Sequence, residues 1–147
     1  MRFKFRLAKV LTVKEIWERQ AKLELFQRML ERQREEDLLK EKAASLDRVW
    51  NQLTCEGIRS GGELTEGVDS LAWARQDFEK QQGAFAAAQE AWTRAKEAFL
   101  LRRSERRSIS KLKEHKRDEY QLALRRKEGK VLDEVAQLLY TAGLRKE

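Results

Sequence analysis

The sequence contains no proline, and its glycines, the other residues that commonly build turns, are gathered in one place. Four of the seven glycines lie within the eleven residues from Gly57 to Gly67. A chain of 147 residues has about the length of one domain, and a compact domain needs many turns. Because this chain marks only one bend strongly, the sequence predicts two long segments joined once.

Cysteine and long apolar runs are also scarce. Cys55 is the only cysteine, which excludes an internal disulfide and a multi-cysteine zinc site within one chain, and which fits a reducing compartment. The longest uncharged run, from Val135 to Leu144, has ten residues, about half of what a membrane-spanning helix needs. Basic residues interrupt the first fourteen positions too often for a secretory signal. We therefore expect a cytoplasmic chain.

Helix-forming residues and charge are what the sequence has in abundance. From Phe5 to Glu56 the chain is rich in Leu, Glu, Lys, Arg, Gln and Ala, which predicts one long helix. Gly57 directly follows this segment, at the position where glycine commonly caps the carboxyl terminus of a helix. Near the end of this segment the apolar positions advance by four and three residues in alternation, which is typical of a coiled coil. These positions are Leu39, Ala43, Leu46, Trp50 and Leu53.

A second helix is predicted over residues 66–142, after a bend at 57–65. Its cap is either Ser60, which precedes Glu63 by three residues, or Thr65. Large apolar residues recur at intervals of seven and alternate with small residues or Gln81, so that rings can fill the spaces on a facing helix. This aromatic heptad, the expected coiled-coil core, consists of Leu71, Phe78, Phe85, Trp92 and Phe99.

Folding the two helices together about Gly61 matches their apolar positions. Residue i then faces roughly residue 122 minus i, which places Trp92 opposite Met29 and Leu30. The agreement of independent patterns predicts an all-α fold, a single antiparallel coiled-coil hairpin over residues 1–147. The second helix is the longer one, and it should overhang after about residue 117.

No catalytic or cofactor site is expected. His115 is the only histidine and lies in a highly charged helical segment, without the nucleophile and orienting acid of a catalytic triad. Acidic residues recur beside basic ones at helical spacing, as solvent-facing helices have them. The sequence has no glycine-rich phosphate loop and no metal-ligand cluster. We therefore predict a protein that is not an enzyme and binds no metal, cofactor or small molecule.

Charge is distributed unevenly along the chain. Residues 1–60 carry a net charge of +4, residues 61–100 carry −3 and residues 101–147 carry +6. In a hairpin the two basic ends lie together. A solvated face, anionic lipid, nucleic acid or an acidic protein surface would each account for the densest run. This basic patch comprises Arg102, Arg103, Arg106, Arg107, Lys111, Lys113, Lys116 and Arg117.

The overhang carries an apolar stripe without an intramolecular partner, close to the apolar residues at the start of the chain. Such stripes usually bind another protein. The alternative is a kink near Gly129 that returns the overhang to the amino terminus. We therefore predict a protein-binding tip with apolar residues from both ends of the chain, among them Phe5, Leu7, Val10, Leu11, Leu124, Val131, Val135 and Leu138.

Both ends of the chain resemble the flagellar export protein family FliJ, a component of the type III export apparatus. The first segment is FKFRLAKVL at 3–11, and the second is EYQLALRRKEGKVLDEVAQLLY at 119–140. The length and the single bend also agree with that family. The matching residues are Phe3, Phe5, Arg6, Leu7, Val10 and Leu11, with Tyr120, Arg126, Glu128, Lys130, Leu132, Asp133, Glu134 and Ala136.

The resemblance implies a stalk similar to the γ subunit of F-type ATPases. The tip, residues 1–20 and 115–142, including Leu132, Asp133 and Glu134, would enter the flagellar export ATPase hexamer. Residues 40–85 would meet the cytoplasmic domain of the export-gate membrane protein, and export chaperones are a further expected partner. The chain would lie at the cytoplasmic face of the cell membrane. Two alternatives are a basic adaptor that binds anionic membrane or nucleic acid nonspecifically, and a self-associating rod.

Overall fold

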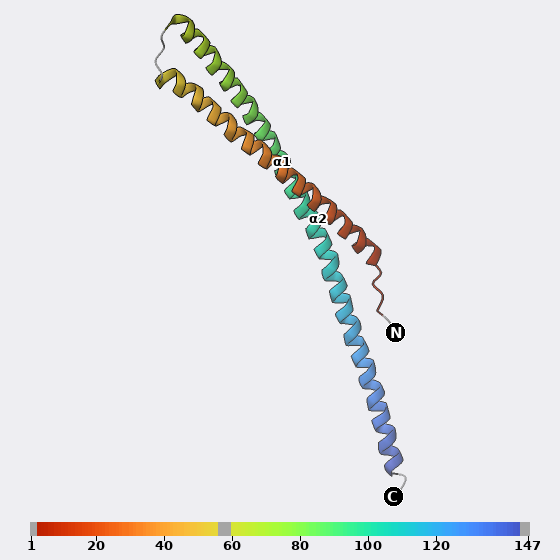
Figure 1. Ribbon diagram of the computed structural model, residues 1–147. Coiled ribbons are helices and arrows are strands. Elements are labelled where there is room, and N and C mark those ends of the chain that lie inside the picture. The colour runs from red at the N-terminus through yellow and green to blue at the C-terminus, as the bar shows by residue number, and fades with distance from the viewer. Residues whose placement is uncertain (1–2, 56–59, 145–147) are drawn as a thin grey trace. The chain divides into compact units, whose positions relative to one another are not determined.

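The computed structural model describes residues 3–55 and 60–144, and it contains two long helices (Figure 1). Helix α1 spans Ala8–Cys55 and helix α2 spans Gly61–Leu144. The described residues contain no strand, and the two helices pack against each other. The predicted all-α fold of two long helices, the second longer, is therefore confirmed. The expected cap at Gly57 lies outside the described residues.

Both helices begin at positions other than those expected. Phe5 precedes α1, because residues 3–5 are extended and Phe5 contributes only its carbonyl oxygen, which accepts a hydrogen bond from the Ala8 N–H at 3.2 Å. Helix α2 begins five residues before position 66. Of the two caps considered, Ser60 acts here, since its Oγ accepts a hydrogen bond from the Glu63 N–H at 3.2 Å. Thr65 lies within the helix, where its hydroxyl donates to the carbonyl oxygen of Gly61.

The chain divides into two compact units. The hairpin unit comprises Trp17–Arg102, and the terminal unit combines Met1–Ile16 with Arg103–Glu147. The hairpin unit is one continuous segment, the terminal unit combines the two ends of the sequence, and each helix contributes to both units. The single hairpin domain expected from the sequence stays a prediction.

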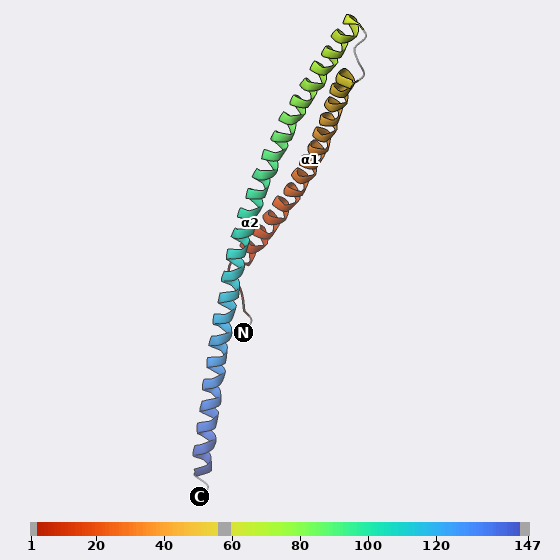
Figure 2. The ribbon, with the colours of Figure 1, turned by 90° about the vertical axis from the view of Figure 1, so that its left-hand side faces the viewer.

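In the hairpin unit α1 and α2 run side by side in opposite directions (Figure 2). All five residues of the aromatic heptad are half-buried. Ala95, a small residue between Trp92 and Phe99, has an exposed fraction of 7%. Gln81 is the polar member of this series, and its amide donates to the backbone oxygen and the carboxylate of Glu35, at 3.2 and 2.5 Å. The contact face of α2 therefore follows the seven-residue repeat, with one polar layer.

Contacts between the two helices lie on both sides of the expected pairing. A hairpin centred on Gly61 places Lys42 opposite Lys80, whereas Lys42 forms a salt bridge with Asp77 at 3.0 Å. The guanidinium of Arg32 lies 5.0 Å from the ring centroid of Trp92. Long side chains such as Lys42 and Arg32 reach past several residues of the opposite helix, so both contacts are compatible with the pairing expected from the apolar repeat.

Gly67 allows the helices to approach closely near the bend. A Cβ atom at this position would lie 2.2 Å from Cδ2 of Leu53, which is closer than any real contact. The side chain of Leu53 therefore occupies the space that a larger residue at position 67 would need. This is a local reason for glycine inside α2, where it otherwise weakens a helix.

Candidate functional site

The described residues include one histidine and one cysteine. They contain no group of three His, Cys, Asp or Glu side chains able to hold a metal ion, and no helix among them is long and apolar enough to span a membrane. His115 is exposed, and its Nδ1 lies 3.2 Å from a carboxylate oxygen of Glu119. Cys55 is exposed at the end of α1. The described residues form two grooves and an exposed apolar segment of α2, and these surfaces are the candidate sites.

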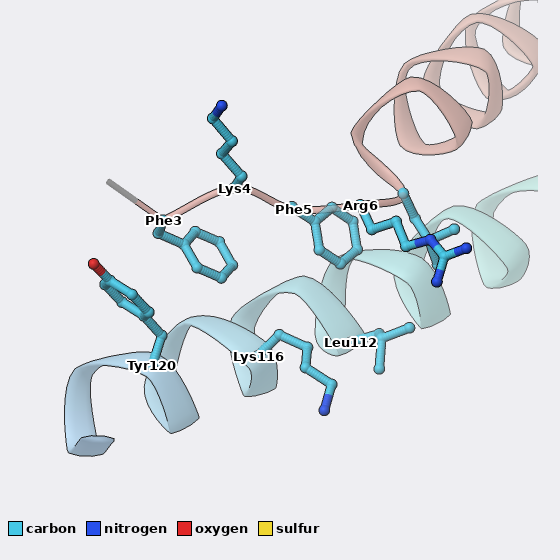
Figure 3. A pocket seen from close by; sticks show the side chains of 8 residues that line it. Phe3, Lys4, Phe5, Arg6, Leu112, Lys116 and Tyr120 are labelled. Atoms are coloured by element: carbon cyan, nitrogen blue, oxygen red, sulfur yellow. The ribbon is translucent and has the colours of Figure 1, made fainter. Parts of the chain in front are cut away.

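The first surface is a groove in the terminal unit (Figure 3). The extended residues 3–5 and the turn at residues 6–7 lie along α2, and the rings of Phe3 and Tyr120 are 5.6 Å apart. Leu11, in the first turn of α1, is 8% exposed and is the most buried residue of this unit. The groove has a volume of about 590 Å³ and combines apolar with cationic side chains. It is lined by Phe3, Lys4, Phe5, Arg6, Leu7, Leu112, Lys116 and Tyr120.

The two units differ in net charge. The terminal unit has 18 basic and 9 acidic residues, a net charge of +9, whereas the hairpin unit has 14 and 16, a net charge of −2. The terminal unit therefore carries the whole positive excess of the chain. A surface of this kind attracts acidic partners and speeds their association.

Most of the basic patch lies in the terminal unit on α2. Arg103 and Arg106 are half-buried, and Arg107, Lys111, Lys113, Lys116 and Arg117 are exposed. Arg102 belongs to the hairpin unit instead, where its guanidinium stacks 4.8 Å from the ring centroid of Trp17. The patch therefore combines stacked and solvated cations.

Ion pairs compensate part of this positive charge. Lys14 of α1 meets Glu105 of α2 at 2.7 Å and holds the two segments of the terminal unit together. The Lys116 ammonium donates to Glu119 at 2.8 Å, and this hydrogen bond lowers the pKa of the Glu119 carboxyl, with a further contribution from His115. Glu119 therefore remains charged in mildly acidic solution.

The predicted tip residues occupy two separate places within the terminal unit. Phe5 and Leu7 are half-buried against residues 112–120 of α2, Leu11 is buried and Val10 is 40% exposed. The members from α2 lie further along that helix, which continues through Gly129 without a break. All of them are exposed: Leu124, Val131, Leu132, Asp133, Glu134, Val135 and Leu138.

A second groove, of about 460 Å³, lies in the hairpin unit. Trp50, which is 55% exposed, lines it together with Leu71 and Phe78 of the aromatic heptad. The heptad residues thus pack between the helices and also form part of an accessible surface. Leu46, Asp47, Arg75, Glu79 and Gln82 complete the lining.

Sequence reasoning named most residues of the terminal groove but did not predict the groove itself, because residue 5 was assigned to a helix. Of the residues that line it, Lys4 and Leu112 were not named. The alternation of aromatic and basic residues in Phe3, Lys4 and Phe5 has the period of an extended segment, and it was the available signal. In the hairpin groove, Arg75 and Glu79 give no such signal, since their pairing at 3.1 Å is an ordinary i,i+4 contact.

Comparison with known proteins gives one match. The sequence model of one family, described as "Flagellar FliJ protein", matches residues 3–145. No curated protein matches the chain, and no solved structure does. The family match covers nearly the whole chain, including both grooves and the exposed segment of α2.

Proposed function

Because the chain belongs to the FliJ family and is thus a component of the flagellar export apparatus, we propose that it is a non-enzymatic stalk that binds and stimulates the export ATPase hexamer. The tip, residues 1–20 and 115–142, is the part that enters the hexamer. The hairpin part around residues 40–85 couples the ATPase to the export gate.

The observation that carries this proposal is the exposed apolar segment at the end of α2. Val131 is 57% exposed and Leu138 is 68% exposed, although both are large apolar residues on one helix. A segment of this kind is stabilised by burial against another protein. The net charge of +9 on the same unit favours a partner with an acidic lining.

The groove beside Trp50 supports a contact with the cytoplasmic domain of the export-gate membrane protein. It lies within residues 40–85 and offers an exposed indole beside Leu71 and Phe78. Partly exposed tryptophans surrounded by polar residues are common anchors in protein interfaces. With this contact the chain works at the cytoplasmic face of the cell membrane, where export chaperones are additional partners.

The experiment is a titration of the purified chain into the flagellar export ATPase, following the hydrolysis rate and the mass of the hexamer together. We expect stimulation by the full chain and none by a chain truncated after Lys116. A full-length Leu138→Asp variant should also lose stimulation, and Trp73→Ala, altered at a 71% exposed side chain of the hairpin unit, should retain it. Equal stimulation by the truncated and the full chain would contradict the assignment of the tip.

The net charge of the terminal unit supports one second candidate, a basic adaptor that binds anionic membrane or nucleic acid nonspecifically. Such binding weakens steeply with salt, log-linearly for nucleic acid. Binding through apolar contacts should survive moderate salt. Salt titrations of binding to the ATPase, to anionic vesicles and to duplex DNA therefore separate the two candidates.

A further inference from the structure

The exposed segment of α2 has a repeat of its own. Positions 124, 128, 131, 135, 138 and 142 advance by four and three residues in alternation, and at 3.6 residues per turn they share one face of the helix. We call this face the terminal stripe. Its large members are 38% to 68% exposed, and its members are Leu124, Glu128, Val131, Val135, Leu138 and Ala142.

Two opposite charges flank the terminal stripe on the same side. Lys127 and Glu134 are one heptad apart, and both occupy the position directly before a stripe residue. In an antiparallel pair of identical helices, such flanking positions face each other across the contact. Lys127 of one copy would then face Glu134 of the second copy, and the same pair would form again on the other side of the two-fold axis.

The parallel arrangement lacks this complementarity. In a parallel pair, each of these flanking residues faces the residue five positions further along the second copy. Lys127 would then face Leu132, and Glu134 would face Leu139. Glu128 would also face Glu128 of the second copy in one layer of the contact, where like charges repel. In the antiparallel arrangement, Glu128 faces Val131 instead. The charge pattern therefore distinguishes the two orientations.

We propose that residues 121–143 of α2 pair with the same residues of a second copy of this chain, in an antiparallel two-fold contact. Leu124 packs against Val135 of the second copy, Glu128 packs against Val131, and Lys127 forms an ion pair with Glu134. The contact is short, and it belongs to the small and weak class of interfaces. We expect a dissociation constant on the order of 10 µM at low salt.

This pairing stands on the residues of the terminal stripe alone and does not depend on the proposed stalk function. It has a consequence for that function, because Val131, Val135 and Leu138 also belong to the proposed tip. Self-pairing and entry into an ATPase ring would then exclude each other. A dimer would shield the apolar stripe until the ATPase displaces the second copy.

The first test measures the mass of the full chain by sedimentation equilibrium at low salt, with a reductant that keeps Cys55 from forming a disulfide. Between about 1 and 200 µM, the mass should rise from 17.4 kDa toward twice that value. Lys127→Glu and Glu134→Lys should each weaken the dimer at least tenfold, because each leaves like charges opposite each other. An equimolar mixture of the two variants should dimerise again, since each contact then joins opposite charges, one pair with the original signs and the other with its signs reversed.

Three further variants test the apolar part of the contact. Val131→Asp should abolish the dimer, and the matched control Leu122→Asp should not, since Leu122 is 50% exposed on the opposite face of the same segment. Glu128→Leu should strengthen the dimer about tenfold, because it removes a charge from the contact. Circular dichroism checks that every variant keeps its helix content.

A chain that stays monomeric at 200 µM overturns the proposal. If Lys127→Glu and Glu134→Lys leave the dissociation constant of the dimer unchanged, the antiparallel orientation is wrong and the proposal as stated is overturned. ATPase stimulation is measured separately, so a monomeric chain that still stimulates the ATPase would remove the pairing and leave the stalk function intact.

Discussion

Trp92 shows how single side chains stabilise a narrow helix pair. Its ring lies between two cations, with the Arg32 guanidinium 5.0 Å and the Lys96 ammonium 5.2 Å from the ring centroid. It is half-buried, because two helices cannot enclose an indole from every side. Cations at such distances are attracted by the negative face of an indole ring.

We predict that Trp92→Ala lowers the free energy of unfolding by about 2 kcal/mol, less than the 3–5 kcal/mol of a fully buried ring. The matched control Trp73→Ala should change it by less than about 0.5 kcal/mol, because Trp73 is 71% exposed. Urea denaturation followed by circular dichroism measures both. Equal effects of the two variants would show that Trp92 does not contribute through its contacts with Arg32 and Lys96.

The pair of Lys42 and Asp77 predicts a dependence on pH. The hydrogen bond to Asp77 raises the pKa of Lys42 above its ordinary value of 10.5. A raised pKa in the folded chain means that the stabilisation is complete below the ordinary pKa and is lost as pH rises through the raised one. The melting temperature of the chain should therefore exceed that of Asp77→Asn slightly at pH 8, and the difference should vanish at a pH above the raised pKa of Lys42. A difference that persists there would argue against the ion pair.

At the scale of the helix, the glycines of α2 differ in whether the surrounding structure leaves room for a side chain. A Cβ at Gly83 meets nothing within 4 Å, whereas a Cβ at Gly67 would overlap Leu53. We predict that Gly83→Ala stabilises the chain by about 0.5–1 kcal/mol through helix propensity. Gly67→Ala should instead destabilise it by about 1 kcal/mol, since the overlap outweighs the gain. Thermal unfolding of the two variants checks this prediction.

A double variant identifies the cause. In a Leu53→Ala background the overlap is gone, so Gly67→Ala should stabilise the chain as Gly83→Ala does. If Gly67→Ala remains destabilising in that background, the close approach to Leu53 is not the reason for glycine at position 67.

At the scale of the whole molecule, packing is uneven. Heptad contacts and interhelical ion pairs hold the hairpin unit together, whereas every described side chain from 121 to 143 is exposed except at Gly129. A helical segment without tertiary contacts is marginally stable in water.

We predict that amide hydrogens of residues 121–143 exchange much faster than those of residues 80–95 in dilute solution. Mass spectrometry of the exchanging chain measures this directly. Protection of residues 121–143 should rise when the concentration increases or the ATPase is added, since both would cover the segment. Uniform protection along α2 at low concentration would contradict the marginal stability of this segment.

Much of the fold was determined by the sequence alone. The absence of proline, the cluster of glycines and the seven-residue spacing from Leu71 to Phe99 predicted two long helices joined by one bend. These features act within a few residues of one another, through helix propensity and the geometry of one helix face. The family resemblance was visible for a similar reason, because the residues that suggested it lie in two short segments, 3–11 and 119–140, and the family match covers residues 3–145.

Tertiary structure decided the features that depend on the opposite helix. The extended course of residues 3–5 along α2 and the contact of Phe3 with Tyr120 depend on a surface that is more than one hundred residues away in sequence. The ion pair of Lys42 with Asp77 and the close approach of Leu53 to Gly67 arose in the same way. A heptad repeat fixes which face of a helix is buried, but the position along that face follows from side-chain shape and charge across the contact, which only the paired helices bring together.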